Sequence, residues 1–158
     1  MKVILKHAGK WLHFSQPENV LRAESLDDVQ PMLREAEASG LFAAGFVSYE
    51  AAPAFDRALK VHSPAGFPLL CIGLFQTPEV LEEIEEQPQS SYEMGKLEPS
   101  VSKSDFMEAI AQIKERIAEG ATYQVNYTYR LNAEFRGDAW PFFCALVKGQ
   151  KTDHAAYI

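Results

Sequence analysis

A helix, a glycine and a long alternating segment follow one another between residues 103 and 131, and this unit restricts the possible folds more than any other part of the chain. Apolar residues between Phe106 and Ile117 recur at helical spacing, and Gly120 is suited to end the helix. From Thr122 to Leu131 polar and apolar residues then alternate, which predicts a β-strand with one polar and one apolar face. Together with the other elements described below, this unit predicts an α+β fold with largely antiparallel sheets and outer helices.

The polar face of this expected strand can be interpreted in two ways. It carries Thr122, Gln124, Asn126, Thr128 and Arg130. One interpretation is a face turned to water, as in many antiparallel sheets. The other is a binding site, because two neutral amides side by side, Gln124 and Asn126, suit recognition of a polar ligand by hydrogen bonds. The alternation alone leaves both interpretations open.

A second candidate region joins an apolar run to polar residues. The run from Leu41 to Tyr49 is short and nearly continuous, which predicts a buried strand. It leads into polar Ser48, Tyr49 and Glu50, so the stretch from Gly45 to Asp56 is either part of a site or a strand end followed by a capped loop. A second buried strand is predicted between Pro68 and Phe75.

The remaining elements follow from capping and turn signals. Ser25 precedes an apolar helical face that Gly40 is suited to end, and Asp138 is placed to cap a last helix. Further strands are predicted at residues 11–14, 20–23 and 155–158.

These elements predict three parts, divided by a glutamate-rich stretch. They are an N-terminal α/β region (1–76), an acidic solvated connector (77–102) and the start of a second domain (103–158). The last predicted strand, Ala155 to Ile158, is apolar and reaches the final residue. We therefore expect this sequence to be a fragment, with the remaining C-terminal part of its own chain as a partner.

Composition excludes several classes of function. The 158 residues are 47% hydrophobic and 23% charged, which is ordinary for a globular protein. A net charge of −7 argues against nucleic acid as a partner. The apolar run at the amino terminus is too short for a secretory signal, and no segment is long enough for a membrane helix, which predicts a cytoplasmic protein. The four histidines are scattered without ligand spacing, so no metal site is expected in this chain.

Three segments carry a resemblance to a known family. Residues 117–131, Ile-Ala-Glu-Gly-Ala-Thr-Tyr-Gln-Val-Asn-Tyr-Thr-Tyr-Arg-Leu, resemble the signature that opens the chorismate-binding domain of chorismate-utilising enzymes. The stretch from Gly45 to Asp56 is similar to that family's Gly-Tyr-x-Ser/Gly-Tyr-Asp/Glu segment, and residues 67–75 to the apolar strand that follows it. The resemblance covers about residues 40–158. It implies the two-half fold of anthranilate synthase, with the chorismate site between the halves.

Two strand positions suggest which branch of the family this is. By this resemblance, the water-adding members have a lysine that activates water at the position of Gln124. The aminating members have a glutamine there, as this chain does. Asn126 favours component I of aminodeoxychorismate synthase (para-aminobenzoate synthase) over component I of anthranilate synthase. The resemblance then implies a transferase that converts chorismate and ammonia to 4-amino-4-deoxychorismate for 4-aminobenzoate and folate biosynthesis. Anthranilate synthase and a non-catalytic binding or interaction module are the alternatives.

The resemblance also implies site residues, a cofactor and a partner. Gln124 is expected at the cleft as the catalytic position, with a pocket formed by Asn126, Thr128, Tyr49, Glu50 and Tyr157. Complete enzymes of this kind use Mg²⁺ and receive ammonia from a glutamine amidotransferase subunit. The family's magnesium-binding glutamates, lysine nucleophile, carboxylate-anchoring arginine and general acid are not found in these residues. We therefore expect the chain alone to be inactive.

Overall fold

The computed structural model describes residues 1–64, 66–84 and 91–158. The chain forms two compact units, Met1–Glu86 with Phe143–Ile158, and Gln87–Phe142. Helix α3 (Ala139–Gln150) contributes to both of them. It begins where the sequence predicts, because the Oδ1 atom of Asp138 accepts a hydrogen bond of 2.9 Å from the backbone N–H of Trp140.

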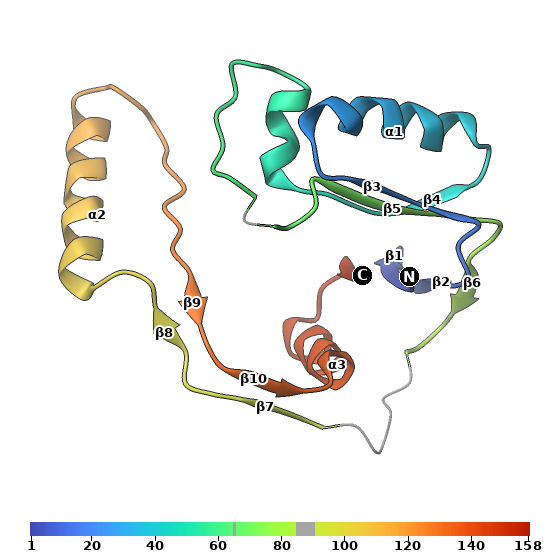
Figure 1. The fold of residues 1–158 in the computed structure, drawn as a ribbon. Coiled ribbons are helices and arrows are strands. Elements are labelled where there is room, and N and C mark those ends of the chain that lie inside the picture. Colours follow the sequence, from blue (N-terminus) through green and yellow to red (C-terminus); the bar gives the residue numbers. More distant parts are fainter. Residues whose placement is uncertain (65, 85–90) are drawn as a thin grey trace. The chain divides into compact units, whose positions relative to one another are not determined.

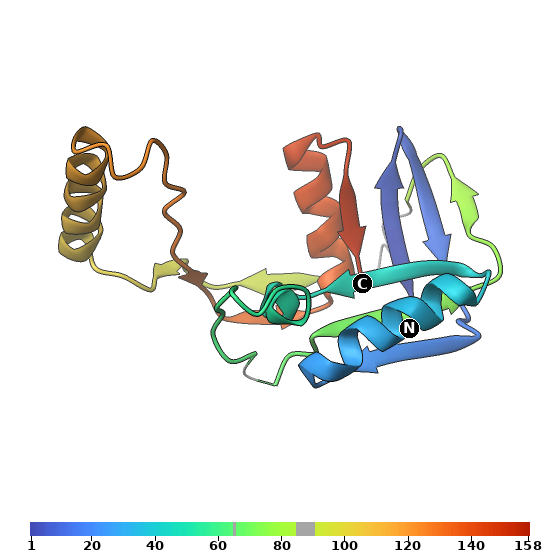
Figure 2. The same cartoon turned by 90° about the horizontal axis from the view of Figure 1, so that it is seen from above.

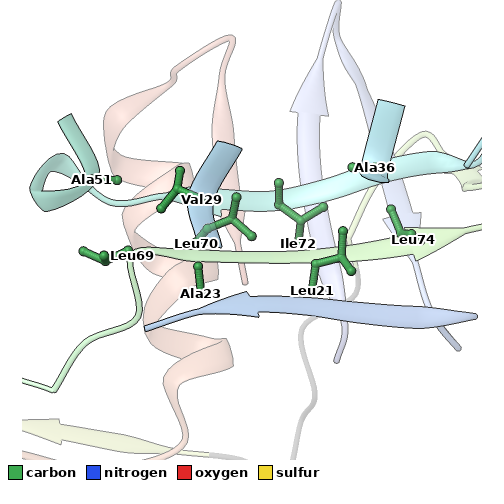
Figure 3. Close-up of a cluster of buried hydrophobic side chains, with 9 residues drawn as sticks. All are labelled: Leu21, Ala23, Val29, Ala36, Ala51, Leu69, Leu70, Ile72 and Leu74. Carbon is green, nitrogen blue, oxygen red and sulfur yellow. The ribbon is translucent and has the colours of Figure 1, made fainter. Parts of the chain in front are cut away.

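A three-stranded antiparallel sheet forms one part of the first unit. Its strand order is β3 (Asn19–Ala23), β5 (Leu70–Phe75) and β4 (Phe42–Val47). Helix α1 (Leu26–Ala38) covers one face of it (Figure 1). Figure 3 shows the core between helix and sheet, which consists of Leu21, Ala23, Val29, Ala36, Ala51, Leu69, Leu70, Ile72 and Leu74. The predictions of β3, of α1 and of a buried β5 are confirmed.

Strand β4 corrects one of the predictions. The sequence predicts a buried strand here, but among the described residues β4 lies at the edge of the sheet and pairs with β5 alone. Its end residues Phe42 and Val47 are 53% and 41% exposed. A continuous apolar run indicates a strand without showing how many neighbours that strand has, which is why the position was wrong. The central Gly45 has a structural role, because a Cβ atom there would lie 2.0 Å from the carbonyl oxygen of Cys71.

A four-stranded antiparallel sheet forms the other part of the first unit. Its order is β11 (Ala155–Tyr157), β1 (Val3–His7), β2 (Lys10–Phe14) and β6 (Glu79–Leu81), and Figure 2 shows these strands side by side. Strand β1 was not predicted. The two sheets meet in a second cluster of buried residues, where the Phe14 and Phe75 rings lie 5.3 Å apart.

The second unit holds helix α2 and two short strand pairs. Strand β7 (Tyr92–Met94) pairs with β10 (Phe135–Gly137), and β8 (Glu98–Pro99) pairs with β9 (Leu131–Asn132). The predicted connector, residues 77–102, therefore contributes strands in its described part, while residues 85–90 lie outside the description. The three-part division of the chain remains a prediction.

Helix α2 (Lys103–Ala118) is confirmed together with its cap. The Oγ atom of Ser102 accepts a hydrogen bond of 3.1 Å from the backbone N–H of Asp105. After the helix, Gly120 adopts a φ of +78°, in the left-handed region that glycine occupies without strain. No residue of α2 is buried.

The prediction that residues Thr122 to Leu131 form a ten-residue strand is wrong for all but the last of them. Residues 122–130 have no strand partner in the described part of the chain, and only Leu131 enters a strand, β9. Alternation specifies which side chains share a face, but a strand also needs a neighbour for its backbone N–H and C=O groups. The apolar side of the alternation does reach the helix, because the rings of Tyr127 and Tyr129 each lie 5.7 Å from that of Phe106.

Candidate functional site

Side chains from both sets of the alternation lie beside helix α2. Thr122, Val125 and Tyr127 line a shallow hollow of about 370 Å³ together with residues of α2. Gln124, Asn126 and Thr128 take no part in that hollow and are exposed. Tyr123, Val125 and Tyr129 of the other set are exposed as well. Solvent or a ligand can therefore reach Gln124, Asn126 and Thr128, but exposure alone does not distinguish the polar set from the apolar one.

A hydrogen bond joins the two amides of this set. The Nε2 atom of Gln124 donates to the Oδ1 atom of Asn126 across 3.4 Å, so both side chains lie on the same side of the segment. Each amide has two N–H donors and an oxygen acceptor. After this bond, the Gln124 oxygen and the Asn126 amino group can still bond a ligand. The pair can thus offer a hydrogen-bond acceptor and hydrogen-bond donors close together on the surface.

The backbone that carries the pair is held from both ends. The hydroxyl of Thr122 donates to the carbonyl oxygen of Gln124 across 3.1 Å. At the other end, the backbone N–H of Ser100 donates to the carbonyl of Arg130 at 2.8 Å, and the N–H of Arg130 donates to the Ser100 hydroxyl at 3.1 Å. These bonds, with the tyrosine contacts to Phe106, position the amides without a sheet.

Tyr49 and Glu50 begin the short 3₁₀ helix η1 (Tyr49–Ala54), which follows β4 in the first unit. Tyr49 is 82% exposed, and Glu50 is half-buried. The turn is fixed through Ser48, whose N–H donates to the Leu69 carbonyl at 2.8 Å and whose carbonyl accepts from Ala51 at 3.1 Å. These two polar residues therefore follow directly after the end of strand β4. The site role expected for them remains a prediction.

Ser48 was grouped with Tyr49 and Glu50 in the sequence but was not counted among the expected pocket residues. Its hydroxyl oxygen is buried and has no hydrogen-bond partner among the described residues. A buried hydroxyl without a partner costs free energy, so such a group is suited to contact a ligand or a bound water. The only sequence signal was its position between an apolar strand and Tyr49.

The last predicted pocket residue, Tyr157, lies in β11 opposite Ile4. It is half-buried, and its ring lies 5.3 Å from that of Phe143. Tyr49, Glu50 and Tyr157 thus belong to the first unit, and Gln124, Asn126 and Thr128 to the second. That the two groups form one pocket remains a prediction.

The comparison with known families is decisive about the class of protein. The sequence model of the chorismate binding enzymes matches residues 2–158, which extends the resemblance seen from about residue 40 to almost the whole chain. No curated protein matches the chain. No helix in the described part of the chain is long and apolar enough to span a membrane. Because the match covers nearly every residue and the fold is the α+β arrangement expected for it, the chain belongs to the chorismate-binding enzyme family.

Proposed function

We propose that this protein is component I of an aminodeoxychorismate synthase, which converts chorismate and ammonia to 4-amino-4-deoxychorismate. The observation that carries the proposal is the hydrogen-bonded pair of exposed neutral amides, Gln124 and Asn126. Chorismate is a polar dianion, and such a pair can bond its oxygens without adding charge.

The amide at position 124 supports an aminating reaction for a chemical reason. Addition of water to a substrate needs a base that accepts a proton from the water, and a glutamine side chain cannot serve as that base. Ammonia is already a neutral nucleophile and needs no such base. Gln124 then has a positioning role, in which its oxygen accepts a hydrogen bond from incoming ammonia.

The other candidate residues would surround the substrate. Thr128 offers a hydroxyl on the same exposed set as the amides, and Tyr49 and Tyr157 offer phenol groups that donate hydrogen bonds to carboxylates. The same proposal assigns ammonia delivery to a glutamine amidotransferase subunit. Glu50 carries a negative charge, so we expect it to face a hydroxyl of chorismate rather than a carboxylate.

Enzymes of the chorismate-binding family use Mg²⁺. Mg²⁺ prefers oxygen ligands, mainly carboxylates and water. Within residues 1–64, 66–84 and 91–158, no three histidine, cysteine, aspartate or glutamate side chains lie together as metal ligands would. The described residues do not fit a magnesium site, and no step proposed here runs through the ion.

Product identification tests the proposal. The protein expressed from its complete gene is incubated with chorismate, ammonium and Mg²⁺, and the products are separated and identified by mass spectrometry. We expect 4-amino-4-deoxychorismate from that protein and no turnover by residues 1–158 alone. Anthranilate as the product would favour an anthranilate synthase, and saturable chorismate binding without turnover by the complete protein would favour a binding module.

A further inference from the structure

Helix α1 and the η1 turn border an open hollow in the first unit, and its lining includes none of the residues assigned to chorismate above. It has a volume of about 560 Å³. Its lining includes Leu26, Asp27, Gln30, Arg34, Phe55 and Arg57. Figure 1 shows α1 beside the short helix that follows β4. A hollow of this size is within the range of small-molecule sites.

Arg34 is held at the hollow by a chain of hydrogen bonds. Its Nη1 atom donates to the Oε1 atom of Gln30 across 3.4 Å, and the Nε2 atom of Gln30 donates to the backbone carbonyl of Ala54. The chain therefore ties α1 to η1 and limits the positions that the guanidinium can take. Its other N–H groups are left for further partners.

Arg57 reaches the same hollow from a hydrogen-bonded turn. The backbone N–H of Leu59 donates to the carbonyl of Asp56 at 3.1 Å, and the carboxylate of Asp56 accepts from the N–H of Ala58 at 2.9 Å. This arrangement fixes the backbone that carries Arg57. Arg34 and Arg57, from separate elements, thus line one concave surface.

The charge at this surface is opposite to that of the whole protein. The chain carries a net charge of −7, yet the charged residues lining the hollow are two arginines and one aspartate. In the part of the chain that the structure describes, neither Arg34 nor Arg57 is within ion-pair distance of a carboxylate. Arg22, in contrast, pairs with Glu24 at 2.7 Å.

We propose that this hollow binds a small carboxylate that carries an apolar group. The carboxylate would lie between Arg34 and Arg57, because the planar guanidinium donates two parallel hydrogen bonds to a carboxylate. The apolar group would cover Leu26 and Phe55, which line the hollow and are 39% and 56% exposed. This second site is independent of the chorismate reaction.

Calorimetry of the chain with benzoate tests the proposal, with acetate and inorganic phosphate as comparison ligands. We expect saturable one-to-one binding of benzoate that weakens as salt is raised, and weaker binding of acetate, which covers less apolar surface. Arg34→Gln and Arg57→Gln should each lower the affinity about tenfold or more, since each removes a charge-assisted hydrogen bond. The matched control is Arg22→Gln, which should bind benzoate like the unchanged protein.

A second pair of variants separates the apolar contact from the charge. Phe55→Ser should weaken the binding of benzoate and leave the binding of acetate unchanged. Arg34→Lys should bind benzoate more weakly than the unchanged protein, because lysine lacks the paired N–H donors of the guanidinium. The proposal is overturned if benzoate shows no saturation, or if the folded arginine variants bind it as tightly as the Arg22→Gln control. Binding of an oligoglutamate peptide at this surface without binding of benzoate would also overturn it, in favour of an acidic partner protein.

Discussion

The amide nitrogen of Gln124 donates a hydrogen bond to the amide oxygen of Asn126, so two side chains that alternate along the sequence meet on one exposed side of the chain. Neither group titrates, so the pair stays neutral at every physiological pH. Its effect on a bound anion then comes from hydrogen bonds and from its geometry. Substitution of either residue can therefore test the contribution of its amide group separately.

Substitution of Asn126 tests whether the pair contacts the substrate. Asn126→Leu keeps the approximate size of the side chain but removes the acceptor for Gln124 and the donors for a ligand. We expect kcat/KM for chorismate to fall about tenfold in the protein from the complete gene, as for loss of one hydrogen bond to a charged group. The matched control is Tyr123→Phe, at a neighbouring side chain that is 92% exposed. Equal kinetics for the two variants would exclude Asn126 from the site.

The two helix caps differ in a way that stability measurements can detect. Ser102 accepts a hydrogen bond from the backbone of Asp105, so Ser102→Ala should destabilise α2 by about 1 kcal/mol. Ser25 precedes α1, but its hydroxyl donates to the carboxylate of Asp28 at 2.7 Å and accepts no backbone bond. We expect Ser25→Ala to cost less than about 0.5 kcal/mol. Amide hydrogen exchange in the first turn of each helix measures both losses of stability. A larger loss for Ser25→Ala than for Ser102→Ala would contradict the assignment of Ser102 as the stronger cap.

The glycines of the first unit provide a second matched comparison. A Cβ atom on Gly45 would meet the backbone of Cys71 and Ile72, whereas one on Gly149 would meet nothing within 4 Å. Gly45→Ala should therefore lower the free energy of unfolding by about 3 kcal/mol or more, because two strands must separate. Gly149→Ala, in helix α3, should raise it by up to about 1 kcal/mol. Urea unfolding checks both, and a mild effect at Gly45 would mean that β4 and β5 are not so closely packed.

The elements predicted correctly are those whose signals are local. Helix α2 has an apolar face, a serine cap and a terminal glycine, all within residues 102–120, and each is present in the structure. Strand β5 is a short apolar run and is buried as such runs usually are. Helix α1 was predicted for the same reasons, although Ser25 caps it less directly than expected.

The errors concern partners, which a local pattern does not specify. Strand β1 was missed because it is short and pairs with β2 and with β11, which lies about 150 residues away along the chain. Strand β4 was predicted to be buried and is an edge. Residues 122–130 alternate as a strand would but lack a neighbour in the described part of the chain.

For the site, the sequence predicted which residues are polar and share a face, and the structure brings Gln124 and Asn126 together. The sequence could not predict the buried Ser48 hydroxyl, because its burial depends on how η1 turns away from the sheet. Nor could it predict that Arg34 and Arg57 line one hollow, since that hollow depends on the Gln30 contact between α1 and η1.

Product analysis of Gln124→Lys tests the central claim most directly, which is that Gln124 faces the incoming nucleophile of an aminating enzyme. A lysine covered by bound chorismate would have its pKa lowered by desolvation and could take a proton from water. We expect amination to fall and a hydroxylated isomer of chorismate, labelled from isotopically enriched water, to appear. The control Gln124→Met has no base and should give no such product. Unchanged amination without any hydroxylated product in Gln124→Lys would contradict the account.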